Sequence, residues 1–205
     1  MLEDGAVHVR GVPDKKVTLR ELARAAVPGP PGMEPGLNAA HFFEAPKMTY
    51  PYGTHVAVVE VDVDTGFVTL LKYGIAYDIG RAVNPMIVDG QLVGALGQGI
   101  GGALLEELVY DEGGQLLTTT FMDYLLPTAM EMPESTAIRI LEETPTPLNP
   151  LGVKGAGEGG SSGSGAALAN AVADALAPLG VSITSLPLSP ERLLALIRNA
   201  RKGTA

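Results

Sequence analysis

The chain has 205 residues, 46% of them hydrophobic, and a formal net charge of -9. This length is sufficient for a substantial core, in one large domain or two small ones. The acidic excess argues against nucleic acid and against an anionic membrane as partners, because both are bound through lysine and arginine. With no cysteine and three histidines, the sequence predicts no disulfide, no iron–sulfur ligation and no metal ion held by protein ligands.

The amino-terminal segment is predicted to be helical. Thr18 and Glu21 have the spacing of a capping box, and the apolar residues of 17–27 recur on one helix face. The prolines and glycines of residues 27–36 then interrupt any regular element. We therefore expect a helical segment with a connector in residues 1–36 and the main domain in residues 37–205. The start of the chain lacks the pattern of a signal peptide or membrane anchor, so a cytoplasmic protein is expected.

Residues 55–77 are typical of a β-hairpin. Two runs rich in β-branched residues and tyrosine flank a turn at residues 64–66. Asp62 and Asp64 near a glycine could also belong to a calcium loop, but the remaining ligands and the closing glutamate of an EF-hand are missing. A tight turn is therefore the preferred interpretation.

Residues 87–109 predict a helix that contains many glycines, each of which costs up to about 1 kcal/mol relative to alanine. Two explanations stay open: close packing against another backbone, or a ligand that lies against the helix surface. Further short strands are expected at residues 115–120, 137–141 and 181–186. Further helices are expected at residues 166–176 and after Ser189, which can cap a helix that begins at a proline. The pattern predicts an α+β fold, with a mixed sheet that includes the β-hairpin and with helices packed on it.

Residues 151–165, LGVKGAGEGGSSGSG, have the composition of a flexible linker. Gly155, Gly157 and Gly160 also satisfy the G-x-G-x-x-G spacing of a dinucleotide-binding turn. The proline-rich residues before this loop disfavour the buried strand that such a turn needs, and Glu158 within it would repel a pyrophosphate. A Walker-type phosphate loop is also unsupported, because the sequence has no Gly-Lys-Ser or Gly-Lys-Thr.

A third interpretation gives Glu158 a chemical role. Glycines let the backbone approach a bulky ligand, and a carboxylate that is shielded from water becomes a better proton acceptor. Glu158 would then act as a base. On the residues alone, an exposed glutamate in a flexible loop remains the simpler alternative.

From about Tyr50 onward the chain contains, in this order, the motifs PYGTHVAVVEVDVDTG, YDIGRAVNPMIVDGQLVGALGQGIGGALLEE, FMDYLLP and NPLGVKGAGEGG. These motifs and their order resemble the large subunits of the molybdenum hydroxylases, the family of xanthine dehydrogenase, aldehyde oxidase and aerobic carbon monoxide dehydrogenase. The resemblance is strongest to the carbon monoxide dehydrogenase branch. It implies that the fold is the second half of a molybdopterin-binding domain.

The resemblance also implies roles for individual residues. Glu158, in the motif GVKGAGE, corresponds to the base that accepts a proton at the molybdenum site. Gln91 corresponds to a hydrogen-bonding contact of the cofactor, and its amide offers both donors and an acceptor. Further cofactor contacts are expected from the same loop and helix, at Lys154, Gly155, Gly157 and Gln98. For both glutamines a plain helix-surface position is the structural alternative.

The implied cofactor is a molybdenum–pterin, either molybdopterin or its cytosine dinucleotide, in which the pterin dithiolene holds the metal. Large subunits of this family are several times longer than this chain, so we expect the isolated chain to lack the cofactor. The implied partners are an upstream large-subunit half, iron–sulfur and flavin subunits, and a small-molecule substrate. The alternative is a truncated, non-catalytic remnant or an assembly module of the same fold.

Overall fold

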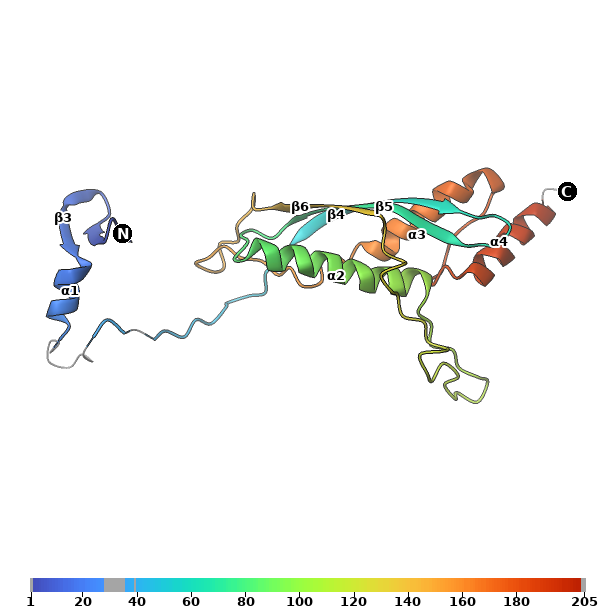
Figure 1. Ribbon diagram of the computed structural model, residues 1–205, viewed down its shortest axis with the longest axis horizontal. Coiled ribbons are helices and arrows are strands. Elements are labelled where there is room, and N and C mark those ends of the chain that lie inside the picture. Colours follow the sequence, from blue (N-terminus) through green and yellow to red (C-terminus); the bar gives the residue numbers. More distant parts are fainter. Residues whose placement is uncertain (1, 28–35, 39, 204–205) are drawn as a thin grey trace. The chain divides into compact units, whose positions relative to one another are not determined.

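The computed structural model describes residues 2–27, 36–38 and 40–203, and the chain forms two compact units, Met1–Glu44 and Ala45–Ala205 (Figure 1). Most of the expected connector, residues 28–35, lies outside the described residues. The division between the compact units falls after Glu44, further along the chain than the end of that connector.

The amino-terminal unit is a small antiparallel sheet followed by one short helix. The helix α1 (Leu19–Ala25) begins with the predicted capping box: the Thr18 hydroxyl accepts from the amide of Glu21 at 3.2 Å, and the Glu21 carboxylate accepts from the amide of Thr18 at 2.9 Å. The sheet was not predicted. Its strands pair in the order β1-β2-β3 and are β1 (Leu2–Glu3), β2 (Ala6–Val9) and β3 (Val12–Thr18).

The larger unit contains a mixed three-stranded sheet in the order β4-β5-β6. The predicted hairpin is confirmed: β4 (Tyr52–Val61) runs antiparallel to β5 (Val68–Asp78). Within the turn, the Asp62 carboxylate accepts a hydrogen bond from the amide of Asp64 at 2.9 Å, so it serves the turn itself. The third strand, β6 (Ser135–Leu141), pairs with β5 in parallel.

Three helices cover one face of this sheet and form the core with it (Figure 1). Side chains alternate along β4, so that Ala57 and Val59 pack against the core while Val56 and Val58 are exposed on the opposite face. Burial of the inward apolar side chains supplies most of the stabilisation. The helical elements are α2 (Pro85–Leu104), α3 (Ser164–Leu176), the 3-10 turn η1 (Ala177–Leu179) and α4 (Pro190–Gly203). The fully buried apolar side chains of the helices are Leu92, Leu96, Ile100, Ala103, Leu168, Val172, Leu176, Leu193 and Ile197.

Two predicted strands are wrong. Residues 115–120 make only an isolated bridge, Tyr110 with Leu116, within a projecting arm that we define as residues 106–134. Residues 181–186 are irregular, because no neighbouring strand pairs with them. The Arg192 guanidinium instead donates to the carbonyl of Leu186 at 2.8 Å and so satisfies that backbone acceptor.

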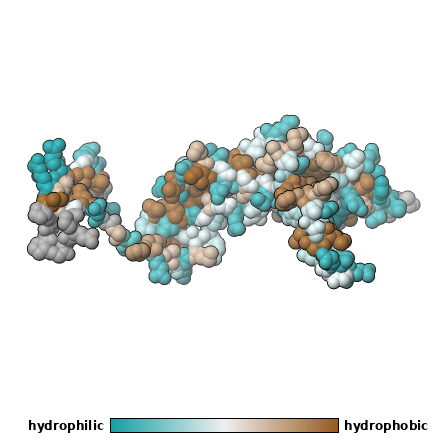
Figure 2. Space-filling model, turned by 60° about the horizontal axis from the view of Figure 1, so that its bottom comes forward, coloured by the Kyte–Doolittle hydropathy of each residue, from teal (hydrophilic) through white to brown (hydrophobic). Residues whose placement is uncertain are grey.

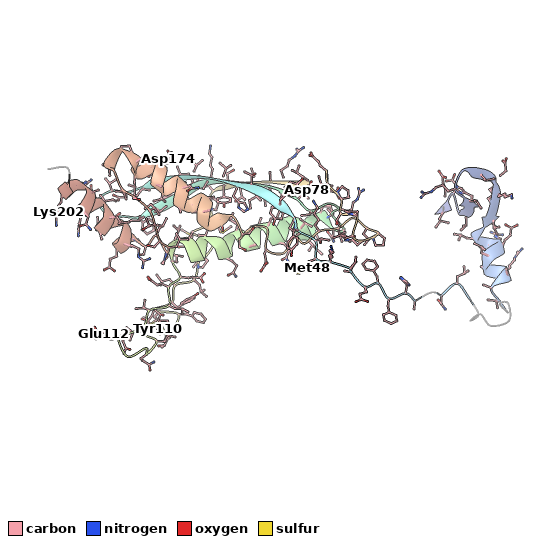
Figure 3. All side chains as sticks on the ribbon, turned by 180° about the vertical axis from the view of Figure 1, so that it is seen from behind. Met48, Asp78, Tyr110, Glu112, Asp174 and Lys202 are labelled. Atoms are coloured by element: carbon pink, nitrogen blue, oxygen red, sulfur yellow. The ribbon has the colours of Figure 1, made fainter. Side chains whose placement is uncertain are left out.

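The arm leaves the body at the end of α2 and carries Tyr110 and Glu112 at its far end (Figure 3). Its side chains are hydrophobic next to the body and hydrophilic at the tip (Figure 2). At its base, Glu107 forms an ion pair with Arg192 of α4 at 2.6 Å. Among the described residues, none of the helices has the length and apolar character needed to cross a membrane.

Candidate active site

Asp78, the last residue of β5 (labelled in Figure 3), connects the end of the sheet to the segment that leads into residues 151–165, the glycine loop. Its side chain is 1% exposed and accepts hydrogen bonds from the amides of Gly80 at 2.9 Å, Glu143 at 3.0 Å and Thr144 at 3.1 Å. It also forms an ion pair at 3.1 Å with the ammonium of Lys154, whose side chain is 8% exposed. The loop therefore begins at a fixed, buried point.

The environment of Asp78 keeps its carboxylate ionised. Burial by itself raises the pKa, but the hydrogen bond from Gly80 and the contacts with Lys154 and Thr144 outweigh it, and the pKa is lowered to about 2. The Lys154 ammonium is engaged by Asp78, by the Thr144 hydroxyl at 2.6 Å and by the face of the Tyr52 ring, 4.7 Å from its centroid. Lys154 thus has a structural partner that the sequence did not indicate, and its contact with a cofactor stays a prediction.

The second half of the glycine loop is packed closely and is not a free linker. A Cβ on Gly159 would lie 2.6 Å from the Tyr77 ring of β5, and a Cβ on Gly160 would overlap the backbone of α2 at Leu92. A Cβ on Gly163 would lie 2.5 Å from the imidazole of His55. These three glycines are needed because strand and helix approach the loop backbone this closely.

The first half of the loop has open space around it. Nothing lies within 4 Å of a Cβ placed on Gly155, and only the Gln91 amide nitrogen, at 3.6 Å, lies near one placed on Gly157. Glu158 follows directly and is exposed. The shielding from water that favours a base is therefore not provided by the described part of this chain. The structure thus brings Gln91 of α2 next to Gly157 of the loop, and the exposed Glu158 is the next residue along the chain.

His55 on β4 contacts the loop from the sheet, a role that the sequence did not predict. Its Nε2 lies 3.0 Å from the carbonyl oxygen of Gly159, and its Nδ1 lies 2.9 Å from the hydroxyl of Tyr73. Because a carbonyl only accepts, Nε2 carries the proton, and in the neutral ring Nδ1 accepts from Tyr73. Burial lowers the pKa of His55, although the bond to Gly159 acts in the opposite direction, and this shift favours the neutral imidazole.

The exposed face of α2 carries both predicted glutamines. Gln91 and Gln98 are seven residues apart, about two turns or 10 Å along the axis, and both are exposed. Gly94 between them has nothing within 4 Å of its Cβ position, whereas a Cβ on Gly99 would overlap the hydroxyl of Ser164 on α3. Close packing thus explains Gly99, while Gly94 belongs to an open face.

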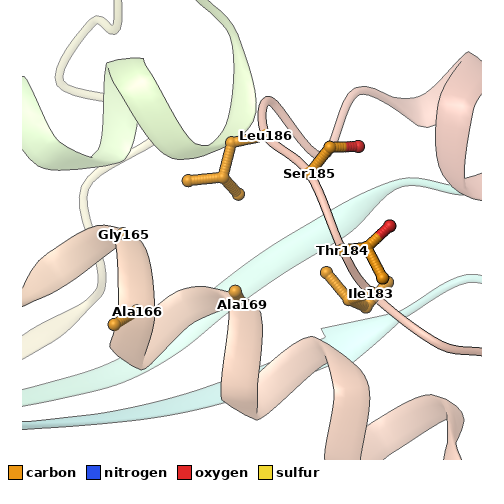
Figure 4. A pocket seen from close by; sticks show the side chains of 7 residues that line it. All are labelled: Gly165, Ala166, Ala169, Ile183, Thr184, Ser185 and Leu186. Atoms are coloured by element: carbon orange, nitrogen blue, oxygen red, sulfur yellow. The ribbon is translucent and has the colours of Figure 1, made fainter.

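A groove lies beside the start of α3 (Figure 4). Small residues of α3 form one wall and residues 183–186 form the other. No ionisable side chain lines this groove, so it offers no acid or base. Within the described ranges, no group of three or more histidine, aspartate or glutamate side chains could hold a metal ion.

A carboxylate in this position can accept a proton from a group bound against the loop and the exposed end of α2. The carbonyl of Glu158 accepts from the amides of Ser161 and Ser162, each at 3.1 Å, so the backbone turns tightly immediately after the carboxylate. The arrangement places a carboxylate and the Gln91 amide beside open backbone, and it leaves any metal to be held by another group.

A sequence model described as the molybdopterin cofactor-binding domain matches residues 1–133. The chain belongs to this family. It is 42% identical, over 98% of its length, to the 6-hydroxypseudooxynicotine dehydrogenase complex subunit gamma of Paenarthrobacter nicotinovorans. It is 39% identical, over 91% of its length, to the carbon monoxide dehydrogenase large chain of Afipia carboxidovorans. The predicted relationship to the molybdenum hydroxylase large subunits is therefore confirmed.

Solved structures of family members have the same fold. The quinoline 2-oxidoreductase from Pseudomonas putida 86 matches 97% of the chain with a TM-score of 0.83 and 43% identity. The Cu,Mo-CO dehydrogenase matches 98% with a TM-score of 0.84 and 36% identity. The predicted α+β fold is thereby confirmed. The chain spans only about a quarter of the length of these family members, between 23% and 25%.

Proposed function

We propose that this chain is the carboxy-terminal part of a molybdenum hydroxylase large subunit and supplies Glu158 as the catalytic base. The observation that carries the proposal is the position of Glu158: an exposed carboxylate on a loop that Asp78 and Lys154 hold on one side and His55 holds on the other. A base has to be held in place relative to the proton that it accepts, and this loop meets that requirement.

The open surface beside Glu158 fits a molybdenum–pterin. Gly155, Gly157 and Gly94 leave free space where a bulky group can lie directly on the backbone, and Gln91 offers amide donors and an acceptor at its edge. We assign Gln91, Gly155, Gly157 and, further along α2, Gln98 as contacts of molybdopterin or its cytosine dinucleotide. When bound, this group supplies the two-electron oxidation chemistry, and the protein contributes the base and the hydrogen bonds.

The proposed site is completed by an upstream large-subunit half. Exposed apolar side chains support this partner: Met86 and Ile87 at the start of α2 are 77% and 58% exposed, and Phe121 and Met122 on the arm are 80% and 89% exposed. Large apolar side chains exposed at these two places, the start of α2 and the arm, support contact with a partner chain. Iron–sulfur and flavin subunits and a small-molecule substrate belong to the same proposed assembly, which we expect in the cytoplasm.

The variant Glu158→Gln in the assembled enzyme tests the base. The chain is co-purified with an upstream half, and molybdenum content, pterin fluorescence and substrate-dependent dye reduction are measured. We expect unchanged cofactor content and a loss of turnover by roughly 10²-fold or more, because an amide cannot accept the proton. Glu112→Gln at the tip of the arm is the matched control and should retain full turnover.

Wild-type turnover in Glu158→Gln would refute the assignment of the base. Absence of both metal and a co-purifying partner from the wild-type chain would instead favour a non-catalytic remnant or an assembly module. The two results separate the role of the residue from the role of the chain.

A further inference from the structure

His55 joins the sheet to the residue that follows Glu158. The imidazole projects from the core-facing side of β4, where it is half-buried, and its Nε2–H donates to the Gly159 carbonyl at 3.0 Å. The Tyr73 hydroxyl on the neighbouring strand donates to Nδ1 at 2.9 Å, and the two rings meet edge to face with centroids 5.8 Å apart. Tyr73 is 2% exposed. Its buried hydroxyl fixes the orientation of the imidazole ring and thereby the direction of the Nε2–H donor.

On the amino-terminal side of Glu158 the support is apolar, because Ala156 is partly buried against the core. Gly155 is exposed with nothing near its Cβ position, and the fixed contacts of Lys154 lie four residues before the carboxylate. Glycines in this stretch leave the backbone many conformations. Gly159, the residue after Glu158, is held by two hydrogen bonds: its amide donates to the Ala156 carbonyl at 3.3 Å, and its carbonyl accepts from His55 at 3.0 Å. The bond from His55 is the one that ties Gly159 to the sheet, so it bears on the direction of the Glu158 side chain.

We propose that His55, oriented by Tyr73, is a positioning residue that sets the direction of the Glu158 carboxylate. This rests on the proposed role of Glu158 as the base and adds the group that places it. The imidazole takes no part in the proton transfer. It acts through the Gly159 carbonyl and through the tight turn in which Ser161 and Ser162 donate to the Glu158 carbonyl.

The first test uses the 205-residue chain and needs no cofactor. His55→Leu removes the donor, whereas His55→Gln places an amide N–H near the position of Nε2. We expect hydrogen exchange at the Ser161 and Ser162 amides to become roughly five- to tenfold faster in His55→Leu, the effect of losing one hydrogen bond, and to stay near the wild-type rate in His55→Gln. Amides in the middle of α2 should be unaffected in both.

The second test uses the assembled enzyme. A misdirected base lowers the rate of the chemical step and leaves substrate binding alone, so His55→Leu should lower kcat by roughly 10- to 100-fold with KM and molybdenum content unchanged. His55→Gln should restore most of kcat. This pattern separates positioning from a merely structural role, because a core defect would alter stability without rescue by glutamine.

Three outcomes overturn the proposal: unchanged exchange at Ser161 and Ser162 in His55→Leu, unchanged kcat in His55→Leu while Glu158→Gln is inactive, or no rescue by His55→Gln. If His55→Leu does not fold, Tyr73→Phe decides, since it keeps the ring and removes the group that orients Nδ1. Wild-type exchange and kcat in Tyr73→Phe then overturn the proposal. If Glu158→Gln is fully active, the proposed function fails. The hydrogen-exchange rates of Ser161 and Ser162 still show whether His55 stabilises the loop.

Discussion

At the scale of single residues, the ion pair between Asp78 and Lys154 is the best protected polar contact of the site. Replacing a buried ion pair by apolar residues is often neutral for stability, but removing one partner leaves an uncompensated charge. Here the three backbone amides that donate to Asp78 make its charge the more firmly held of the two. The carboxylate should therefore control how stability depends on pH.

The variant Asp78→Asn tests that control. The folded-state pKa of about 2 lies below the unfolded value, so the contribution of Asp78 is complete above about pH 4 and is lost as the pH falls towards 2. In urea unfolding at several pH values, we expect this carboxyl to account for about 2 kcal/mol of the stability that the wild-type chain loses between pH 5 and pH 2. Asp78→Asn should lack that part of the loss and be less stable at pH 7.

The exposed Asp174→Asn on α3 is the control and should keep the pH dependence of the wild type. A pH dependence of Asp78→Asn equal to that of the wild type would contradict the lowered pKa. Lower stability at pH 7 alone would not be enough to support it.

At the scale of elements, the glycines of α2 should respond in opposite ways to alanine. Gly94→Ala adds a methyl group to an open helix face and should raise the free energy of unfolding of the isolated chain by up to about 1 kcal/mol. Gly99→Ala places the methyl group on the buried Ser164 side chain and should lower it by about 1–3 kcal/mol. Chemical unfolding of both variants measures this; a shift of equal sign would show that α2 and α3 do not pack as described.

The elements that could be predicted have ends that are specified by residues close together in the sequence. The capping box at Thr18, the turn at Asp62 and the proline after Ser189 each specify an end of an element through neighbours a few residues away. The strands expected at 115–120 and 181–186 failed because a strand needs a pairing partner, which local pattern cannot supply.

For the site, sequence could indicate the loop and Glu158 but not what holds them. The roles of Asp78 and His55 depend on contacts with residues far along the chain, at Lys154 and Gly159. His55 did carry one usable signal. It occupies an inward position in the alternation of β4, together with Ala57 and Val59, where a polar residue needs a partner.

At the scale of the whole molecule, the proposed contact with an upstream half can be tested at the exposed apolar side chains of α2. Met86→Glu and Ile87→Glu should change the free energy of unfolding of the isolated chain by no more than about 0.5 kcal/mol, because both side chains are already exposed. In co-purification with an upstream half, both should reduce the yield of complex, since a charge would have to be buried. Lys202→Glu, near the end of α4, is the control and should leave the yield unchanged; equal yields for all three variants would exclude this face of α2 as the interface.

The parallel pairing of β5 with β6 has a consequence for biosynthesis. Parallel strands require a long crossover, and here it runs through α2 and the arm before β6 appears. Such non-local pairing slows folding, and the hairpin of β4 and β5 emerges from the ribosome well before α3 is available to cover it. The apolar face of the hairpin is therefore open to aggregation during synthesis. Because the glycine loop follows β6, a chain whose synthesis stops before β6 lacks both the parallel strand and Glu158.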